Sequence, residues 1–417
     1  MPEVGETVPV ALHQSGMPIF EMNARVCRRE NTVFGSKLAL CFINGFLEFD
    51  KLMSRNVQAQ IAQQSAAFAD DTLKLVPREY RVFCADVLKV LGSYRDLLDV
   101  NLNLARQVER EFDSDGAYNA CEPRLLQKFR SLWRTANDLT KDVLNDREAL
   151  AATKSYTETV LTPEFRQGAV SDRAYAKPLG YPGDFEVMNQ VYDWQRRGNT
   201  VYQMLMHRVG LDILECVRTR METVLASISE TVQEKGHSRP ARIMSLGSGP
   251  AREVELFLAG GLHSRHAEFT LIDQEQAALS YALEKTSPYL AAANRKARVQ
   301  CLNVSFTDIL RGGGPLKSLP PQDLVYCVGL IDYLTDRRAG ALIRRLYESL
   351  APGGLLIIGN MNETPDSCVW PGEFLLDWTL YYRNEQEMLA WVEGFGAKAW
   401  TETEASGRVR LLFARKP

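Results

Sequence analysis

A change of sequence pattern at about residue 240 constrains the fold more than any other feature. Beyond this point, short apolar runs of the kind found in strands are separated by helix-like stretches. These runs cover residues 241–246, 269–272, 299–304, 324–328, 355–358 and 409–414. Strands that alternate with helices form a parallel sheet with helices on both faces. We therefore predict an α/β fold with a doubly wound sheet over residues 241–417.

Before residue 240, the apolar residues follow the period of a helix. In residues 125–143 they recur at steps of three and four, as on one face of an amphipathic helix. We predict a mainly α-helical N-terminal region over residues 1–240, with residues 1–20 loosely ordered. Residues 32–50 fit either a pair of strands or a buried helix, and the apolar spacing over residues 57–68 predicts a short helix.

The composition excludes several classes of protein. Lys and Arg total 49 against 52 Asp and Glu, a net charge of −3, so no basic field indicates a nucleic-acid partner. No apolar run approaches the ~20 residues that a membrane span needs, and the start MPEVGETVPV lacks the order of a signal peptide. The eight cysteines form no CxxC pair and the five histidines no HxxxH pair, so we expect reduced thiols and no metal. The composition predicts a cytoplasmic protein and leaves a homo-oligomer open.

The run IMSLGSGPARE combines a strand, a Gly-x-Gly turn and the start of a helix. Gly247 and Gly249 let the backbone turn tightly and let a ligand approach the main chain, and Pro250 suits the first turn of a helix. An arginine replaces the third glycine of the pyrophosphate-binding pattern GxGxxG. Asp273 ends the next strand, where a carboxylate can accept both hydroxyls of a ribose. Ordinary loops also contain Gly-x-Gly, but the carboxylate favours a nucleoside. The missing third glycine favours one without a pyrophosphate, which is S-adenosylmethionine rather than NAD.

With these motifs, residues 240–417 resemble the class I S-adenosylmethionine-dependent methyltransferases. The resemblance implies a Rossmann-like methyltransferase sheet with S-adenosyl-L-methionine as its cofactor. In that family the glycine turn packs on the methionine part, the acid binds the ribose, the loop after the third strand flanks the adenine, and the end of the fourth strand faces the methyl group. Carried over by position, the cofactor-binding residues are Gly247, Gly249, Pro250, Glu253, Asp273, Asn303, Val304, Ser305, Phe306 and Gly329. Ser245 stands where the family has an acid, and we expect Glu253 to supply acidity there.

The stretch YAKPLGYPGDFEVM, residues 175–188, is dense in glycine, proline and tyrosine. Such loops often serve as functional lids, and we predict a lid over the methyl-donor end of the site. We expect Tyr181 to take part in catalysis, and Tyr175, Lys177 and Asp184 to bind substrate. The alternative is a capped helix start with Asp184 as the N-cap.

Three segments give a narrower resemblance over residues 155–417. KPLGYPGD, GLIDYLTD and DWTLYYRNEQEM are similar to the bacterial PhcB-type methyltransferases of 3-hydroxypalmitic acid methyl ester synthesis, which make a quorum-sensing signal. The resemblance implies that the carboxylate of a 3-hydroxy fatty acid is converted to its methyl ester.

The residues around the predicted transfer site agree with a carboxylate acceptor. A carboxylate is ionised at neutral pH and needs no general base, and no histidine falls in these motifs. We expect Asp332 and Tyr333 to act in catalysis, and Trp378 and Tyr382 to bind the substrate. The apolar stretch 374–382, on an expected helix, would line an acyl channel or pack on the helical region. Two alternatives stay open: O- or N-methylation of another small metabolite, and a regulatory module that binds S-adenosylmethionine without turnover.

Overall fold

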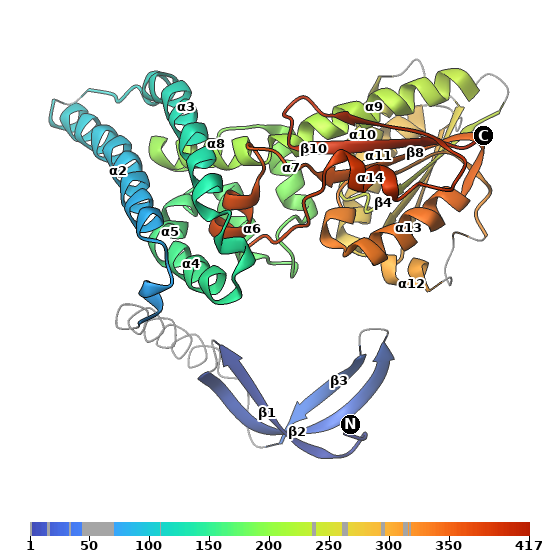
Figure 1. Cartoon of the computed structure of the whole chain (residues 1–417), viewed down its shortest axis with the longest axis horizontal. Coiled ribbons are helices and arrows are strands. Elements are labelled where there is room, and N and C mark those ends of the chain that lie inside the picture. Colours follow the sequence, from blue (N-terminus) through green and yellow to red (C-terminus); the bar gives the residue numbers. More distant parts are fainter. Residues whose placement is uncertain are drawn as a thin grey trace. The chain divides into compact units, whose positions relative to one another are not determined.

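The computed structural model in Figure 1 describes most of the chain. The described residues are 2–14, 17–32, 35–43, 71–108, 110–235, 239–260, 266–292, 297–311, 316 and 318–417. The chain divides into two compact units, Met1–Val76 and Pro77–Pro417. No helix within the described ranges is long and apolar enough to cross a membrane.

The first unit contains a three-stranded antiparallel sheet in the order β1-β2-β3. Its strands are β1 (Thr7–Gln14), β2 (Met17–Thr32) and β3 (Gly35–Phe42). The expectation of a loosely ordered start is wrong, because β1 pairs with β2 along its whole length. Ala24 and Val26 are buried at alternate positions of β2, which is the two-residue period of a strand. The helix expected over residues 57–68 lies outside the described residues.

A set of helices opens the second unit, in agreement with the helical pattern of the sequence. They are α2 (Arg78–Gln107), α3 (Ser114–Thr140), α4 (Arg147–Val160), α5 (Thr162–Phe165), α6 (Ala169–Ala176), α7 (Phe185–Asp193), α8 (Val201–Ile213) and α9 (Glu215–Lys235). Leu125, Phe129 and Trp133 bury the apolar face of α3. These helices belong to the same compact unit as the sheet that follows. The predicted domain boundary near residue 240 stays a prediction.

The seven-stranded sheet confirms the prediction of an α/β, doubly wound fold. Its strands are β4 (Ala241–Leu246), β5 (Ala267–Asp273), β6 (Ala297–Asn303), β7 (Gln322–Cys327), β8 (Leu350–Met361), β9 (Lys398–Thr403) and β10 (Val409–Arg415). Their order is β6-β5-β4-β7-β8-β10-β9, with β4 to β8 parallel and β10 antiparallel to both of its neighbours. The order reverses between β4 and β7, where open α/β sheets bind their ligands.

Helices cover both faces of this sheet (Figure 1). On one face lie α9, α10 (Arg252–Ala259) and α11 (Gln276–Ala292). On the other lie α12 (Phe306–Leu310), α13 (Asp336–Glu348) and α14 (Glu385–Ala390), which pack on the buried core between helices and strands.

The segment that follows β8 leaves the sheet and packs among the N-terminal helices. Its π-helical turn, Trp370–Leu375, replaces part of the helix expected over 374–382, whose remainder is irregular. The Trp370 indole N–H donates to the Tyr80 hydroxyl at 2.9 Å, and Trp133 donates to the Ser367 carbonyl at 2.8 Å. Phe374 is buried against the Tyr80 ring. For this part of the stretch, packing on the helical region is therefore the correct interpretation.

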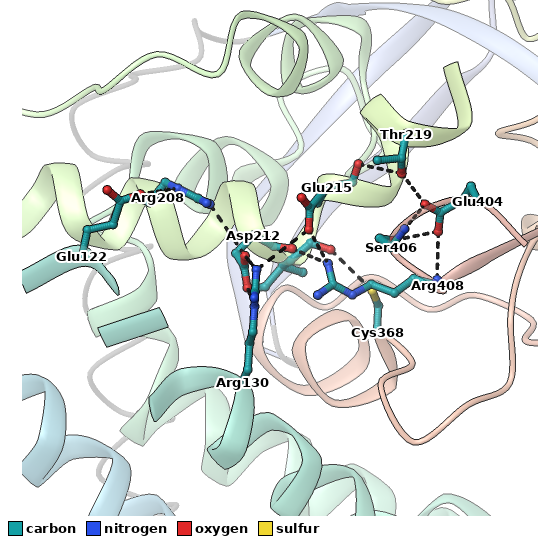
Figure 2. A network of polar contacts seen from close by, with 11 residues as sticks. Glu122, Arg130, Arg208, Asp212, Glu215, Thr219, Cys368, Glu404, Ser406 and Arg408 are labelled. Carbon is teal, nitrogen blue, oxygen red and sulfur yellow. Dashed lines mark hydrogen bonds and ion pairs between the residues drawn. The ribbon is translucent and has the colours of Figure 1, made fainter. Parts of the chain in front are cut away.

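A buried polar network fastens the first turns of α9 to the turn between β9 and β10 (Figure 2). The Glu404 carboxylate accepts hydrogen bonds from the Thr219 hydroxyl and from the backbone N–H groups of Arg408 and Val409. The Arg408 guanidinium donates to the Asp212 carbonyl at 2.5 Å. The network fixes the start of α9 relative to the sheet.

Candidate active site

A cavity of about 310 Å³ lies at the carboxyl ends of the sheet strands, beneath α7 and α9. The residues that follow β4 to β7 form its floor, and the segment after β8 closes one side. Of the predicted site residues, it is lined by Tyr181, Gly247, Gly249, Pro250, Glu253, Asp273, Val304, Phe306, Gly329, Asp332, Tyr333, Trp378 and Tyr382. The topology thus brings together residues that are up to about 200 positions apart in the sequence.

The Gly-x-Gly turn adopts a backbone conformation that favours glycine. Gly247 and Gly249 have φ angles of +68° and +50°, in the left-handed region. The Gly247 N–H donates to the Ile272 carbonyl at 2.8 Å, so the turn continues the pairing of β4 with β5. The expectation that Pro250 lies in the first helical turn is wrong, because α10 begins two residues later, at Arg252.

Asp273 stands at the end of β5 with its carboxylate directed at the glycine turn. Its two oxygens accept the N–H groups of Gly249 at 2.8 Å and Glu275 at 2.9 Å. Burial raises the pKa of Asp273, and these N–H groups oppose the rise. Each carboxylate oxygen keeps acceptor capacity for a further donor. The carboxylate is thus placed to accept a pair of hydroxyl groups from a ligand in the cavity.

The residues after β6 divide into two pairs. Val304 and Phe306 line the cavity. Asn303 and Ser305 do not: the Asn303 amide donates to the carbonyls of Asp273 at 3.1 Å and Gln274 at 2.9 Å, and Ser305 caps α12. Asn303 and Ser305 therefore hold the loop on which Val304 and Phe306 stand.

Glu253 lies in the first turn of α10, at the cavity wall. It is buried, and its carboxylate accepts a hydrogen bond from the Tyr326 hydroxyl at 2.7 Å. Burial raises its pKa, while the Tyr326 hydrogen bond and the Arg220 charge oppose the rise. Glu253 is thus the acid expected near the glycine turn, and Tyr326 of β7 holds it in place.

The turn after β7 carries Asp332 and Tyr333. Arg383 holds this turn by donating to the Leu334 carbonyl at 2.5 Å and to the Asn360 side chain at 2.7 Å. Burial raises the pKa of Asp332 to about 6, although the Arg220 charge opposes the rise. One Asp332 carboxylate oxygen, Oδ1, is buried without a hydrogen-bond partner in the described part of the chain.

Tyr333 meets Trp378 across the cavity wall. The Trp378 indole N–H donates to the Tyr333 hydroxyl at 2.9 Å, so the Tyr333 proton is free to be donated to a ligand. The Tyr382 hydroxyl is also buried at the cavity, and no described residue hydrogen-bonds to it. Burial raises the pKa of both tyrosines, which therefore act as O–H donors at neutral pH.

The segment predicted as a lid reaches the cavity with Tyr181 and Gly183. The side chains of three other residues expected to bind substrate do not line it. The Tyr175 hydroxyl donates to Glu158 at 2.6 Å, and Lys177 pairs with Asp377. Asp184 is the N-cap of α7, accepting from the Val187 N–H at 2.9 Å, and it pairs with Arg173. The alternative interpretation of Asp184 as a helix cap is therefore the observed one, and the three residues hold the segment in place.

One charged residue in the cavity wall was missed in the sequence. Arg220 of α9 lines the cavity among Val217, Met221 and Val224. In the sequence, Arg220 interrupts the apolar face of an amphipathic helix, and this interruption is the pattern that could have identified it. The described residues contain no group of three or more His, Cys, Asp or Glu side chains that can hold a metal ion.

The strand order, the glycine turn and the carboxylate at the end of β5 agree with the Rossmann-like methyltransferase fold that the sequence predicts. No family model matches the chain. A stretch of 137 residues is 28% identical to trans-aconitate 2-methyltransferase of Methylobacterium nodulans, covering 33% of this chain and 43% of that protein. The chain thus spans less than half the length of this curated relative.

Two of the solved structures to which this chain is similar are the following. A possible exported protein from Bordetella parapertussis is 17% identical, with a TM-score of 0.46 over 64% of this chain and 97% of that one. Magnesium protoporphyrin IX methyltransferase from Synechocystis, with SAH bound, is also 17% identical, with a TM-score of 0.40 over 59% and 98% of the two chains.

Proposed function

We propose that the protein is an S-adenosylmethionine-dependent methyltransferase and that the cavity is its active site. The supporting observation is a group of buried polar atoms in the cavity wall without partners among the described residues. They are the Ser248 hydroxyl, Asp332 Oδ1 and the Tyr382 hydroxyl. Buried polar groups in native proteins are nearly always hydrogen-bonded, so these three fit a polar ligand.

The described residues fit the cofactor. Asp273 is placed to accept the two ribose hydroxyls, and Val304 and Phe306 supply apolar surface for the base. A side chain at Gly249 would stand in open space, so the glycine leaves the backbone accessible to a ligand. When bound, S-adenosylmethionine supplies a methyl group on a positively charged sulfur.

For the methyl acceptor, we propose the carboxylate of an acid with an apolar tail. A 3-hydroxy fatty acid, whose methyl ester would act as a quorum-sensing signal, fits this description. The cavity wall is largely apolar, and burial of a tail is worth ~0.8 kcal/mol per methylene. The apolar wall includes Met188, Val217, Met221, Val224, Leu376 and Leu380.

The tyrosines at this end suit a carboxylate. Tyr181, Tyr333 and Tyr382 all line the cavity, and we expect them to donate to one carboxylate oxygen and leave the other exposed as the nucleophile. Holding reacting atoms in line in this way can be worth ~7–11 kcal/mol of the barrier. The apolar wall excludes water from the nucleophile, whose charge is then less shielded.

Asp332 supports a second candidate function, O- or N-methylation of another small metabolite. A carboxylate acceptor needs no general base, but the cavity wall contains a residue that can act as one. Asp332 is buried at the cavity, has an unpaired oxygen and has a pKa raised to about 6. A carboxylate of this kind can take a proton from a hydroxyl or amine at neutral pH.

One experiment separates the two candidates. Purified protein is incubated with methyl-labelled S-adenosylmethionine and fatty acids, phenols or amines, and the labelled product is treated with mild base. A methyl ester releases its label and supports the carboxylate; an ether or methylamine keeps it and supports the second candidate. Asp332→Asn should retain ester formation and lose ether or amine formation. Cofactor binding without transfer to any compound would indicate a regulatory module.

The cytoplasmic location and a homo-oligomeric state also remain proposals. All eight cysteines are free thiols, which agrees with a reducing compartment.

A further inference from the structure

Arg220 is a cationic side chain of the cavity wall whose charge acts on the buried carboxyls of Glu253 and Asp332 without an ion pair to either. It lies in the second turn of α9, faces the cavity and is only partly exposed. Among the residues that the structure describes, none forms a hydrogen bond or an ion pair with its guanidinium. Arginine is seldom removed from water unless it is paired, because the loss of hydration is costly.

Two other arginines near this part of the chain have hydrogen-bonded partners within the protein. Arg408 donates to the Asp212 carbonyl at 2.5 Å and lies 3.8 Å from the Glu215 carboxylate (Figure 2). Arg383 donates to a carboxylate, an amide and two carbonyls. The unpaired guanidinium of Arg220 is therefore a specific feature, and it points to a ligand.

Arg220 is held in position by its neighbours. Thr219, the preceding residue, is bonded to the Glu404 carboxylate, so the helix is fixed to the sheet at this point (Figure 2). On the cavity side, a Cβ added to Gly329 would lie 2.7 Å from the Arg220 Nη2 atom. The guanidinium therefore lies against the backbone at the end of β7.

The order of the strands places Arg220 at one end of a linear ligand. Val304 and Phe306 follow β6, Asp273 ends β5, the glycine turn follows β4, and Gly329 follows β7. These strands are adjacent in the order β6-β5-β4-β7. A ligand with its base beside β6 and its ribose at β5 has its remaining part across the ends of β4 and β7. In S-adenosylmethionine that part is an amino acid, which ends in a carboxylate.

We propose that Arg220 binds the carboxylate at the amino-acid end of S-adenosylmethionine. The guanidinium matches a carboxylate in charge and in its two-pronged geometry. The helical region then supplies part of the cofactor site, which residues 241–417 alone do not complete. This inference rests on the proposed function, because it assumes that cofactor.

The test compares two ligands that differ at this end. S-adenosylhomocysteine carries the amino-acid carboxylate, and methylthioadenosine lacks the amino-acid part. Calorimetry with full-length Arg220→Gln should show affinity for S-adenosylhomocysteine about tenfold to a hundredfold weaker, the range for a charged hydrogen bond. Methylthioadenosine should bind both proteins equally, which also shows that the variant is folded. The affinity of Arg220→Lys for S-adenosylhomocysteine should lie between those of the wild type and Arg220→Gln.

Two further variants make the test specific. Arg218→Gln removes the same charge from the same helix outside the cavity lining and should bind both ligands as the wild type does. Gly329→Ala leaves Arg220 in place but pushes its guanidinium aside, and should weaken only S-adenosylhomocysteine.

Unchanged affinity of Arg220→Gln for S-adenosylhomocysteine, or an equal loss for both ligands, would overturn the inference. A loss of fatty-acid binding with unchanged cofactor affinity would also overturn it, by placing Arg220 at the methyl acceptor. If the wild type binds neither ligand, the proposed function itself fails.

Discussion

The indole N–H of Trp378 donates a hydrogen bond to the hydroxyl of Tyr333 at 2.9 Å. This contact joins two segments that follow different strands, β8 and β7, at the end of the cavity where we place methyl transfer. Gly183 of the predicted lid lies against both side chains, since a Cβ there would meet the Trp378 ring at 2.6 Å and the Tyr333 hydroxyl at 3.0 Å. The segments that carry Tyr333, Trp378 and Gly183 therefore together fix the direction of the Tyr333 hydroxyl, which can donate a hydrogen bond to a ligand.

Trp378→Phe should release the Tyr333 hydroxyl while keeping most of the apolar contact. We expect a loss of about 0.5–1.5 kcal/mol in the free energy of unfolding, the usual worth of one hydrogen bond. The KM for the methyl acceptor should rise, because the Tyr333 hydroxyl no longer has a fixed direction. Denaturant titration and steady-state kinetics measure both effects. Equal kinetic constants in variant and wild type would show that the contact does not orient the substrate.

Gly183→Ala should disturb the same contact by steric pressure. The added methyl group cannot fit 2.6 Å from the Trp378 ring, so the ring must move. We expect weaker acceptor binding and unchanged affinity for S-adenosylhomocysteine. Gly92→Ala is the matched control, because a Cβ at that helical position meets nothing within 4 Å, and it should stabilise the protein by up to about 1 kcal/mol. A Gly183→Ala enzyme with normal acceptor kinetics would argue against a lid at this place.

Asp273→Ala should weaken the binding of S-adenosylhomocysteine by about 1.5–3 kcal/mol, the range for a charge-assisted hydrogen bond. The substitution also removes the acceptor for the Gly249 N–H, so the glycine turn should loosen. Glu268→Gln provides a control on the same strand, where the side chain pairs with Arg242. Calorimetry gives the affinities. Unchanged affinity in Asp273→Ala, or tighter binding of NAD than of S-adenosylmethionine by the wild type, would contradict the assignment.

The buried carboxyl of Asp332 predicts a pH dependence of stability. Its pKa rises from an ordinary 3.8 to about 6 on folding, so the folded state binds the proton more tightly. The resulting stabilisation is complete below pH 3.8 and is lost as the pH rises through 6. Asp332→Asn cannot ionise. Its free energy of unfolding should therefore rise relative to that of the wild type, by up to about 3 kcal/mol, as the pH increases from 3.8 to 6.

Denaturant titrations at several pH values measure this gain. Asp86→Asn is the control, because its carboxyl is exposed on α2, and it should follow the pH dependence of the wild type. Parallel curves for Asp332→Asn and wild type would mean that Asp332 does not change its proton affinity on folding.

The parts of the fold that the sequence predicted correctly depend on local patterns. The Gly-x-Gly turn, Asp273 and the short apolar strands each occupy a few consecutive residues, and the fold then places the ends of parallel strands at one edge. The sheet class follows from that regularity. Val304, Phe306 and Gly329 come from the family resemblance, carried over by position; they line the cavity, and their role in cofactor binding stays a prediction.

The remaining features depend on contacts between distant residues. Lys177 pairs with Asp377, 200 positions later, and Trp370 bonds to Tyr80, 290 positions earlier, so neither partner is visible locally. Asp184 satisfies the pattern for a lid and for a helix cap, and only the structure distinguishes them. Arg220 is not predicted from the sequence, because it stands among apolar residues at helical spacing, a pattern that core packing alone explains.

The most direct test of the central claim is methyl transfer by the purified protein. Methyl-labelled S-adenosylmethionine is supplied with carboxylic acids of increasing chain length, and the labelled product is counted before and after mild base. The account predicts a base-labile product whose yield at low acid concentration rises with chain length until the cavity is filled. Absence of label in any product, together with no binding of S-adenosylhomocysteine, would contradict it.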